Sequence, residues 1–178
     1  MRRSLDELAS AQLVFTPGTT GPERVAACKG FMREAMADLR ERHDHGGSGL
    51  EIEHGRAAII DALVYRLFDH AVGLYAQTRG PTPAAVAMLA LGGYGRRELA
   101  PWSDIDVMFL YPTKSKEAVV QPFQAHLTQE VLYPLWDCGL KVGHSTRTVE
   151  EVFVQAKKEI MTMTALLESR YVAGSAAL

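Results

Sequence analysis

The sequence predicts an α+β fold, in which a pair of long N-terminal helices precedes a small mixed β-sheet with flanking helices. Two patterns carry this prediction. Apolar residues recur every three or four positions through most of residues 22–80, which is the helical period. Residues 85–91 and 104–112 each hold a short continuous apolar run of the length of a buried strand, and glycines lie between them.

The composition is that of an ordinary globular protein with room for one core. The 178 residues are 47% hydrophobic and 22% charged, and their net charge is −2. This balance gives no electrostatic reason to expect nucleic acid or a membrane surface as a partner. No apolar run reaches the length of a membrane span, and the N-terminus has no signal-peptide pattern. Cys28 and Cys138 are far apart in the sequence, so we expect free thiols in a cytoplasmic protein.

Clusters of glycine and proline divide the chain into three parts. Residues 1–21 end in TPGTTGP and are expected to form a flexible N-terminal arm. Residues 22–80 are a helical segment, interrupted by HDHGGSG and closed by TRGPTP. Residues 81–178 hold the predicted sheet.

The third part alternates strand and helix patterns. The strand at 85–91 leads into about one helical turn in YGRRELA, and the strand at 104–112 follows. Residues 116–138 are expected to form a helix that Pro134 kinks or restarts. The segment GLKVGHSTRT is a candidate for a third, shorter strand.

The end of the chain is expected to be helical. Thr148 and Glu151 have the spacing of a capping box, which would start the last helical region. That region extends through RYVAG at residues 170–174 in two pieces, and Met161 and Met163 fit its apolar pattern as core residues.

Two carboxylates stand together where the second strand begins. Side chains alternate between the two faces of a strand, so Asp104 and Asp106 point to one side while Ile105 points into the core. Carboxylates that close repel each other, and a divalent cation bound by both reverses this penalty. Mg²⁺ suits the pair, because it takes one or two carboxylates and fills its other positions with water and substrate phosphates. Asp104 and Asp106 are therefore predicted to bind metal and to be catalytic in a reaction at phosphorus.

Gly92 and Gly93 end the first strand where the chain must turn. Without side chains they let backbone N–H groups approach a ligand, and the helical turn that follows orients its dipole favourably for an anion. Ser103 can donate its hydroxyl to a phosphate oxygen, and Arg96 and Arg97 have the shape to pair with phosphate charge.

Each of these features also has a purely structural interpretation. A Gly-Gly pair is usually a turn, a D-x-D pair is common at solvated strand ends, and Arg96 with Glu98 can be a surface pair. Trp102 can stack on a base or anchor its loop against the core, and His144 can line a pocket or be structural. Together, however, the residues spell G-G-x-G-R-x-E-x-x-P-x-S-D-I-D between two strands, which is unlikely to arise by chance.

The string resembles the signature of the DNA polymerase beta-type nucleotidyltransferase superfamily, in which a glycine pair and a D-x-D strand form the active site. Within that superfamily, GGYGRRELAPWSDIDVMFLY is most similar to the N-terminal catalytic domain of the bacterial PII uridylyltransferase/uridylyl-removing enzymes. RERHDHGGSGLEIEHGRAAIIDALVYRLF resembles the helical segment that precedes this motif in the family, and LWDCGLKVGHSTRTVEE and TALLESRYVAG resemble segments that follow it. The similarity thus covers roughly residues 22–178.

The resemblance implies Mg²⁺-dependent transfer of UMP from UTP to a tyrosine hydroxyl of the nitrogen-signalling protein PII, with release of pyrophosphate. It implies that the nucleotide is bound by Gly92, Gly93, Arg96 and Ser103, and the metal by Asp104 and Asp106. Two alternatives stay open. One is a related nucleotidyltransferase, of the CBS-associated or adenylyltransferase type, with another nucleotide or acceptor. The other is a nucleotide-binding regulatory module without turnover.

The sequence departs from the family pattern in two places. Arg97 stands where the family usually has glycine. Many superfamily members carry a third carboxylate on a later strand, whereas here the nearest candidates are His144, Glu159 and Glu168, and Glu168 is expected to pair with Arg170 instead. The HD hydrolase and ACT domains of the family lie outside this sequence, so removal of the uridylyl group and glutamine sensing are not expected of it.

Overall fold

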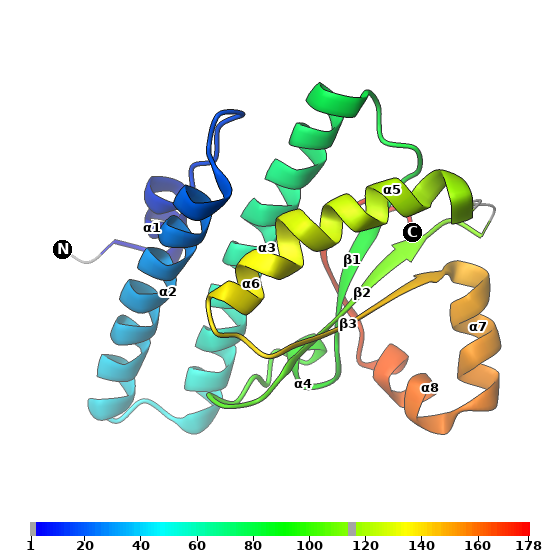
Figure 1. Cartoon of the computed structure of the whole chain (residues 1–178). Coiled ribbons are helices and arrows are strands. Elements are labelled where there is room, and N and C mark those ends of the chain that lie inside the picture. The colour runs from blue at the N-terminus through cyan, green and yellow to red at the C-terminus, as the bar shows by residue number, and fades with distance from the viewer. Residues whose placement is uncertain (1–2, 114–116) are drawn as a thin grey trace.

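The computed structural model describes residues 3–113 and 117–178 (Figure 1). The helices are α1 (Leu5–Gln12), α2 (Gly21–Asp44), α3 (Gly49–Arg79), α4 (Gly92–Gly95), α5 (Glu117–Leu127), the π-helical η1 (Thr128–Leu132), α6 (Tyr133–Asp137), α7 (Val149–Lys158) and α8 (Ile160–Leu167). The strands are β1 (Ala87–Leu91), β2 (Ile105–Tyr111), β3 (Val142–Thr148) and β4 (Arg170–Gly174).

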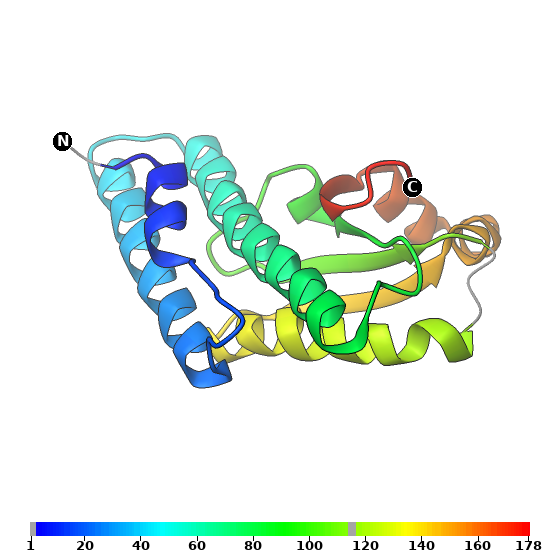
Figure 2. The same cartoon turned by 90° about the horizontal axis from the view of Figure 1, so that it is seen from above.

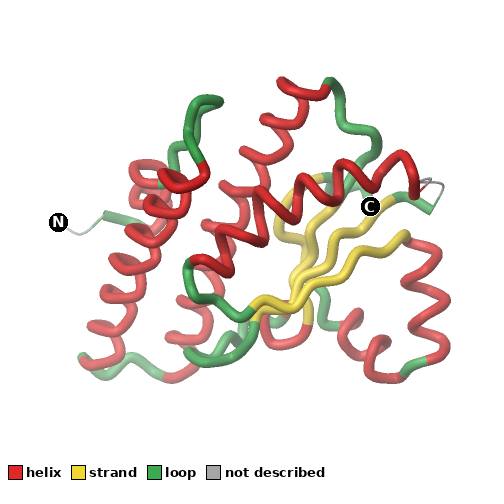
Figure 3. Tube along the Cα trace, viewed as in Figure 1, coloured by secondary structure: helices red, strands yellow, loops and turns green. Residues whose placement is uncertain are grey.

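The strands form one mixed sheet in the order β3-β2-β1-β4 (Figure 3). β1 is antiparallel to both β2 and β4, whereas β2 and β3 are parallel. The predicted α+β class with a small mixed sheet is therefore confirmed.

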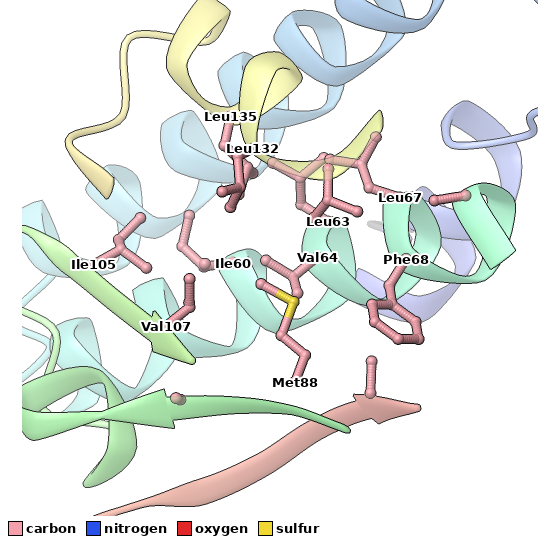
Figure 4. Close-up of a cluster of buried hydrophobic side chains, with 14 of the residues drawn as sticks. Ile60, Leu63, Val64, Leu67, Phe68, Met88, Ile105, Val107, Leu132 and Leu135 are labelled. Atoms are coloured by element: carbon pink, nitrogen blue, oxygen red, sulfur yellow. The ribbon is translucent and has the colours of Figure 1, made fainter. Parts of the chain in front are cut away.

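Helices cover the two faces of this sheet unequally. α3 and the run α5–η1–α6 lie on one face, with α1 and α2 beyond α3, and α7 and α8 lie on the other (Figures 1 and 2). The main core forms between α3, η1, α6 and the sheet (Figure 4); its fully or almost fully buried side chains include Ile60, Leu63, Val64, Leu67, Met88, Ile105, Val107, Leu132 and Leu135. The helical pair predicted for residues 22–80 thus supplies one wall of the core.

Capping boxes begin four of the helices. In each, a Ser or Thr accepts a hydrogen bond from the N–H of a Glu three residues later, and that Glu carboxylate accepts one from the capping N–H. The predicted box at Thr148 is confirmed. The others cap α1 with Ser4, α2 with Thr20 and α3 with Ser48.

Pro134 restarts the helix, as one of the two expected outcomes. It stands in the first turn of α6, where its missing N–H costs nothing. Immediately before it, the N–H of Tyr133 donates to the carbonyl of Thr128, five residues back, which is the π-helical pattern of η1.

Three expectations differ from the structure. The described part of the expected arm is not loose, because α1 buries Leu8 and Ala9 in the main core. Residues 170–174 are not helical but form β4, which pairs with the edge of β1. Met161 and Met163 are not core residues, since they keep 83% and 43% of their surface exposed.

Two further observations bear on the composition. Cys28 is buried, Cys138 is half-buried, and both are free thiols. Within residues 3–113 and 117–178, no helix combines the length and the apolar character needed to cross a bilayer.

Candidate active site

The register of the sheet brings the glycine turn and the aspartates to the same end. In the antiparallel pair of β1 and β2, Leu91 lies opposite Asp106, and Gly92 follows Leu91 directly. The two halves of the predicted site, which lie more than ten residues apart in the sequence, are therefore neighbours in space.

Asp104 and Asp106 are both exposed to solvent, and Asp106 lies on the α7–α8 face of the sheet. Ile105, between them, is fully buried in the main core, as predicted. Asp106 shares its side of β2 with Met108 and Leu110, which belong to the small cluster under α7 and α8. Both carboxylates are exposed, and the Asp104 side chain keeps 64% of its surface.

β3 and the residue just before it contribute two residues that sequence reasoning did not single out. Gly143 lies opposite Asp106 in the parallel register, and a Cβ at this position would overlap Asp106 Oδ1. Lys141 Nζ lies 4.0 Å from Asp104 Oδ1, but both side chains are largely exposed, so this pair adds little stability. The available signal was a glycine inside a strand, which often marks a close approach.

The glycine turn is a single helical turn, α4, that begins at Gly92 rather than near Tyr94. Gly92 has φ +53°, in the left-handed region that favours glycine. Gly95 must also be glycine for a steric reason, because a Cβ there would overlap the carbonyl of Glu168 and meet that of Ala90 at 3.0 Å. The turn is thus packed tightly against the end of α8 and against β1.

A partly buried network of hydrogen bonds among Tyr94, Asp61 and Arg170 connects this turn to α3 and β4. The Tyr94 hydroxyl donates to Asp61 Oδ1 of α3 at 2.7 Å, and burial raises the pKa of Tyr94 well above its usual range, which keeps the donor proton in place. Arg170 of β4 donates to both oxygens of Asp61, at 2.9 and 3.0 Å, and to the carbonyls of Tyr94 and Gly95. Side chains of α3 and β4 therefore hold α4 in place, in addition to its close packing against β1 and the end of α8.

Arg96 is engaged by two carboxylates. Its Nε lies 2.7 Å from Glu98 Oε2, which confirms the expected partner, and its Nη1 lies 2.5 Å from Glu168 Oε2. The hydrogen bond to Glu98 raises the pKa of the Arg96 guanidinium. The predicted pair of Glu168 with Arg170 is wrong, because Arg170 binds Asp61 instead.

The loop that carries Ser103 is fixed from inside the molecule by Arg56, another residue that sequence reasoning missed. This buried α3 side chain donates to the carbonyl of Ala100 and, at 3.3 Å, to that of Ser103, and burial lowers its pKa. The Ser103 hydroxyl donates to Ala100 O at 3.0 Å. Trp102, between them, is 92% exposed, so its interpretation as an anchor in the core is wrong.

Arg97 lies just after α4, and it lines a cavity rather than joining the ion pairs of Arg96. Its φ is +64°, and it is the one non-glycine residue of the described chain with positive φ. Its exposed side chain lines a cavity between α1, α3 and β4. An L side chain rarely adopts this conformation, whereas the glycine that the family resemblance led us to expect here would adopt it without penalty.

The carboxylates fit magnesium as a pair rather than as a larger cluster. In the described ranges, no group of three or more His, Cys, Asp and Glu residues gathers to hold a metal ion. Of the candidate third ligands, Glu168 binds Arg96, Glu159 accepts from Thr162, and His144 packs against the Trp136 ring. Two exposed carboxylates suffice for Mg²⁺, which completes its coordination with water and phosphates.

Comparison of the sequence with known proteins identifies a nucleotidyltransferase family. The family described as "Putative nucleotidyltransferase DUF294" matches residues 27–161. The chain is 39% identical over 175 residues to the bifunctional uridylyltransferase/uridylyl-removing enzyme of Novosphingobium aromaticivorans, which covers 97% of the chain and 19% of that protein. Identity is 40% over 154 residues to the enzyme of the same name from Azospirillum brasilense (86% and 16%) and 40% over 181 residues to that from Erythrobacter litoralis (97% and 19%).

The chain spans less than one fifth of the length of these relatives, while they match most of the chain. The resemblance predicted from the glycine turn and the aspartate pair is confirmed. The family match extends over well more than half of the chain, and the chain belongs to the DUF294 nucleotidyltransferase family.

Proposed function

We propose that this domain transfers UMP from UTP to a tyrosine hydroxyl of the signal protein PII, in the cytoplasm and with Mg²⁺ as cofactor. The observation that carries the proposal is the pairing of Leu91 with Asp106, which sets the glycine turn beside the two carboxylates. The choice of a uridylyl donor is supported by relatives named uridylyltransferase that are about 40% identical, and the choice of PII follows from the family resemblance of the sequence.

The proposed reaction is a substitution at phosphorus. The tyrosine oxygen forms a bond to the α-phosphorus of UTP, the bond to the pyrophosphate oxygen breaks, and the hydroxyl proton is released. When bound, Mg²⁺ supplies positive charge for the triphosphate and for the pyrophosphate that leaves.

The residues of the chain would bind and orient the nucleotide. Asp104 and Asp106 hold the metal, and the backbone N–H groups of Gly92 and Gly93 face the phosphates. Ser103 donates to a phosphate oxygen after its hydroxyl turns away from Ala100 O. Arg96 lies beside the turn but is paired with Glu98 and Glu168, so it would contact a phosphate only after releasing one of these carboxylates.

The first test is calorimetric titration of UTP with Mg²⁺ into the chain and into the double variant Asp104→Asn/Asp106→Asn. We expect UTP affinity to fall at least about tenfold, or about 1.4 kcal/mol, because the isosteric amides remove both negative charges from the site. Since both side chains are exposed, the unfolding temperature should change little. Unchanged UTP affinity in a folded double variant would refute the metal site.

The second test concerns the substrates. The chain is incubated with PII, Mg²⁺ and UTP, ATP or CTP, and mass spectrometry of PII records any added nucleotide; the Novosphingobium enzyme is the positive control. UMP added to a tyrosine supports the proposal. Preference for ATP or CTP would favour a related nucleotidyltransferase, and nucleotide binding without modified PII would favour a regulatory module, provided that the control enzyme modifies PII.

A further inference from the structure

The cavity that Arg97 lines, between α1, α3 and β4, has a volume of about 620 Å³. This volume is typical of sites for small organic ligands. Ala9, Ala58 and Ala62 are among the residues that line it, and their short side chains leave the space open. The three alanines come from two helices, so the hollow is a feature of how α1 packs beside α3.

This cavity lies on the opposite side of the sheet from the aspartates. Arg170, which lines it, pairs in register with Ala90, and Ala90 is buried in the main core on the α3 side. Asp106 pairs with the next residue, Leu91, whose side chain belongs to the small cluster under α7 and α8. Alternation along β1 therefore separates the two sites.

Arginines that lack carboxylate partners line the cavity. Of its three arginines, only Arg170 is balanced, by Asp61. In the described part of the chain, the hydrogen-bond partner of the Arg66 side chain is the neutral hydroxyl of Ser10, at 2.8 Å, and the Arg97 guanidinium has neither an ion pair nor a hydrogen bond. The remaining lining carboxylate is that of Asp6, in the first turn of α1. The cavity thus has spare guanidinium groups suited to an anion.

The backbone of Arg97 is a second, independent indication. Its φ of +64° is unfavourable for a residue with a side chain, and glycine would occupy the position without penalty. Strained residues of this kind are concentrated at ligand sites, where the side chain has a use. Here the residue with this conformation is one that lines the cavity.

Aromatic rings complete the lining. Tyr65 and Tyr171 both line the cavity and keep 52% and 44% of their surface exposed. Exposed tyrosine rings can stack on a planar group, while the arginines bind an anion. We propose that this cavity binds a phosphorylated small molecule with a planar ring, of the size of a nucleoside monophosphate, without metal and at a site separate from the aspartate pair.

The proposal is tested by calorimetric titration of AMP into the chain in EDTA, where the Mg²⁺-dependent site is silent. AMP should bind, and inorganic phosphate should bind at least about fivefold more weakly, since it lacks a ring. Arg97→Gly should weaken AMP binding at least about fivefold, and Ala62→Leu should abolish it by filling the cavity. The Asp104→Asn/Asp106→Asn variant should bind AMP as the wild type does.

Circular dichroism melts establish that each variant is folded. Ala62 lies on α3, and leucine is a good helix former, while glycine suits the φ of residue 97. If either variant is unfolded, Arg66→Gln replaces it, because glutamine keeps a donor for Ser10 without the charge. The proposal is overturned if AMP at about 5 mM gives no heat, or if phosphate binds as tightly as AMP. It is also overturned if the folded cavity variants bind AMP as the wild type does, or if the aspartate variant loses binding. None of these outcomes bears on UTP binding with Mg²⁺.

Discussion

The two faces of the sheet differ in how many side chains they bury. On the α3 face, side chains from the helices and strands form a large cluster in which Leu63 and Phe109 are at most 1% exposed (Figure 4). On the α7–α8 face, the buried residues of the described chain are Ala87, Met108 and Leu110, and neither α7 nor α8 has a buried residue.

The difference separates stability from chemistry. Burial of apolar surface on the α3 face supplies most of the folding free energy, because that term grows with the area removed from water. The opposite face contributes little to the folding free energy. It can therefore tolerate exposed carboxylates at Asp104 and Asp106 and a glycine at residue 143. It can also leave Ile160 and Leu167 at 74% and 81% exposure.

A matched pair of substitutions tests this contrast and should give the largest effect. Leu63→Ala removes a fully buried side chain, and we expect it to lower the free energy of unfolding by about 3 kcal/mol through lost burial and a new cavity. Leu167→Ala makes the same chemical change at 81% exposure and should cost less than about 0.5 kcal/mol. Urea unfolding followed by circular dichroism measures both. Similar losses at the two positions would show that α8 is packed in solution.

A second prediction concerns the face with the aspartates. Gly143→Ala places a methyl group where Asp106 Oδ1 now lies, so the carboxylate must shift. We expect Mg²⁺-dependent UTP affinity to fall about tenfold, or about 1.4 kcal/mol, while the unfolding free energy changes little. Titration calorimetry measures the affinity.

Ser145→Ala, two residues further along β3, is the matched control and should bind UTP normally. If Gly143→Ala also bound UTP normally, the position of Asp106 would not matter for the nucleotide, and the proposed site would lose its main geometric support.

Local patterns made much of this structure predictable. The long amphipathic helices, the strands that became β1 and β2, and the box at Thr148 all depend on residues close in the sequence. The fold class followed from the helical period of residues 22–80 and the apolar runs at 85–91 and 104–112, and the family followed from the glycine turn and the D-x-D strand, which lie close together in the chain. Their proximity in space needed only an antiparallel pairing.

The features that the sequence did not predict depend on contacts between residues that are far apart in the chain. β4 continues the helical spacing of α8, and only its partner β1 makes it a strand. The clearance of Gly143 for Asp106 requires the parallel register of β2 with β3. The bonds of Arg170 to Asp61 join residues 109 positions apart, so no local pattern announces them.

The smallest expected effect concerns Arg97, on the α3 side. Arg97→Gly removes the cost of a side chain at φ +64°, about 1.5 kcal/mol, but gives the unfolded chain more freedom, which costs about 0.5–1 kcal/mol. Arg97→Ala loses the same guanidinium but keeps the Cβ and therefore the backbone penalty. We expect the glycine variant to be more stable than the alanine variant by about 0.5 kcal/mol, measured by urea unfolding. Because the two differ only at Cβ, equal stabilities would mean that residue 97 leaves the left-handed region in solution.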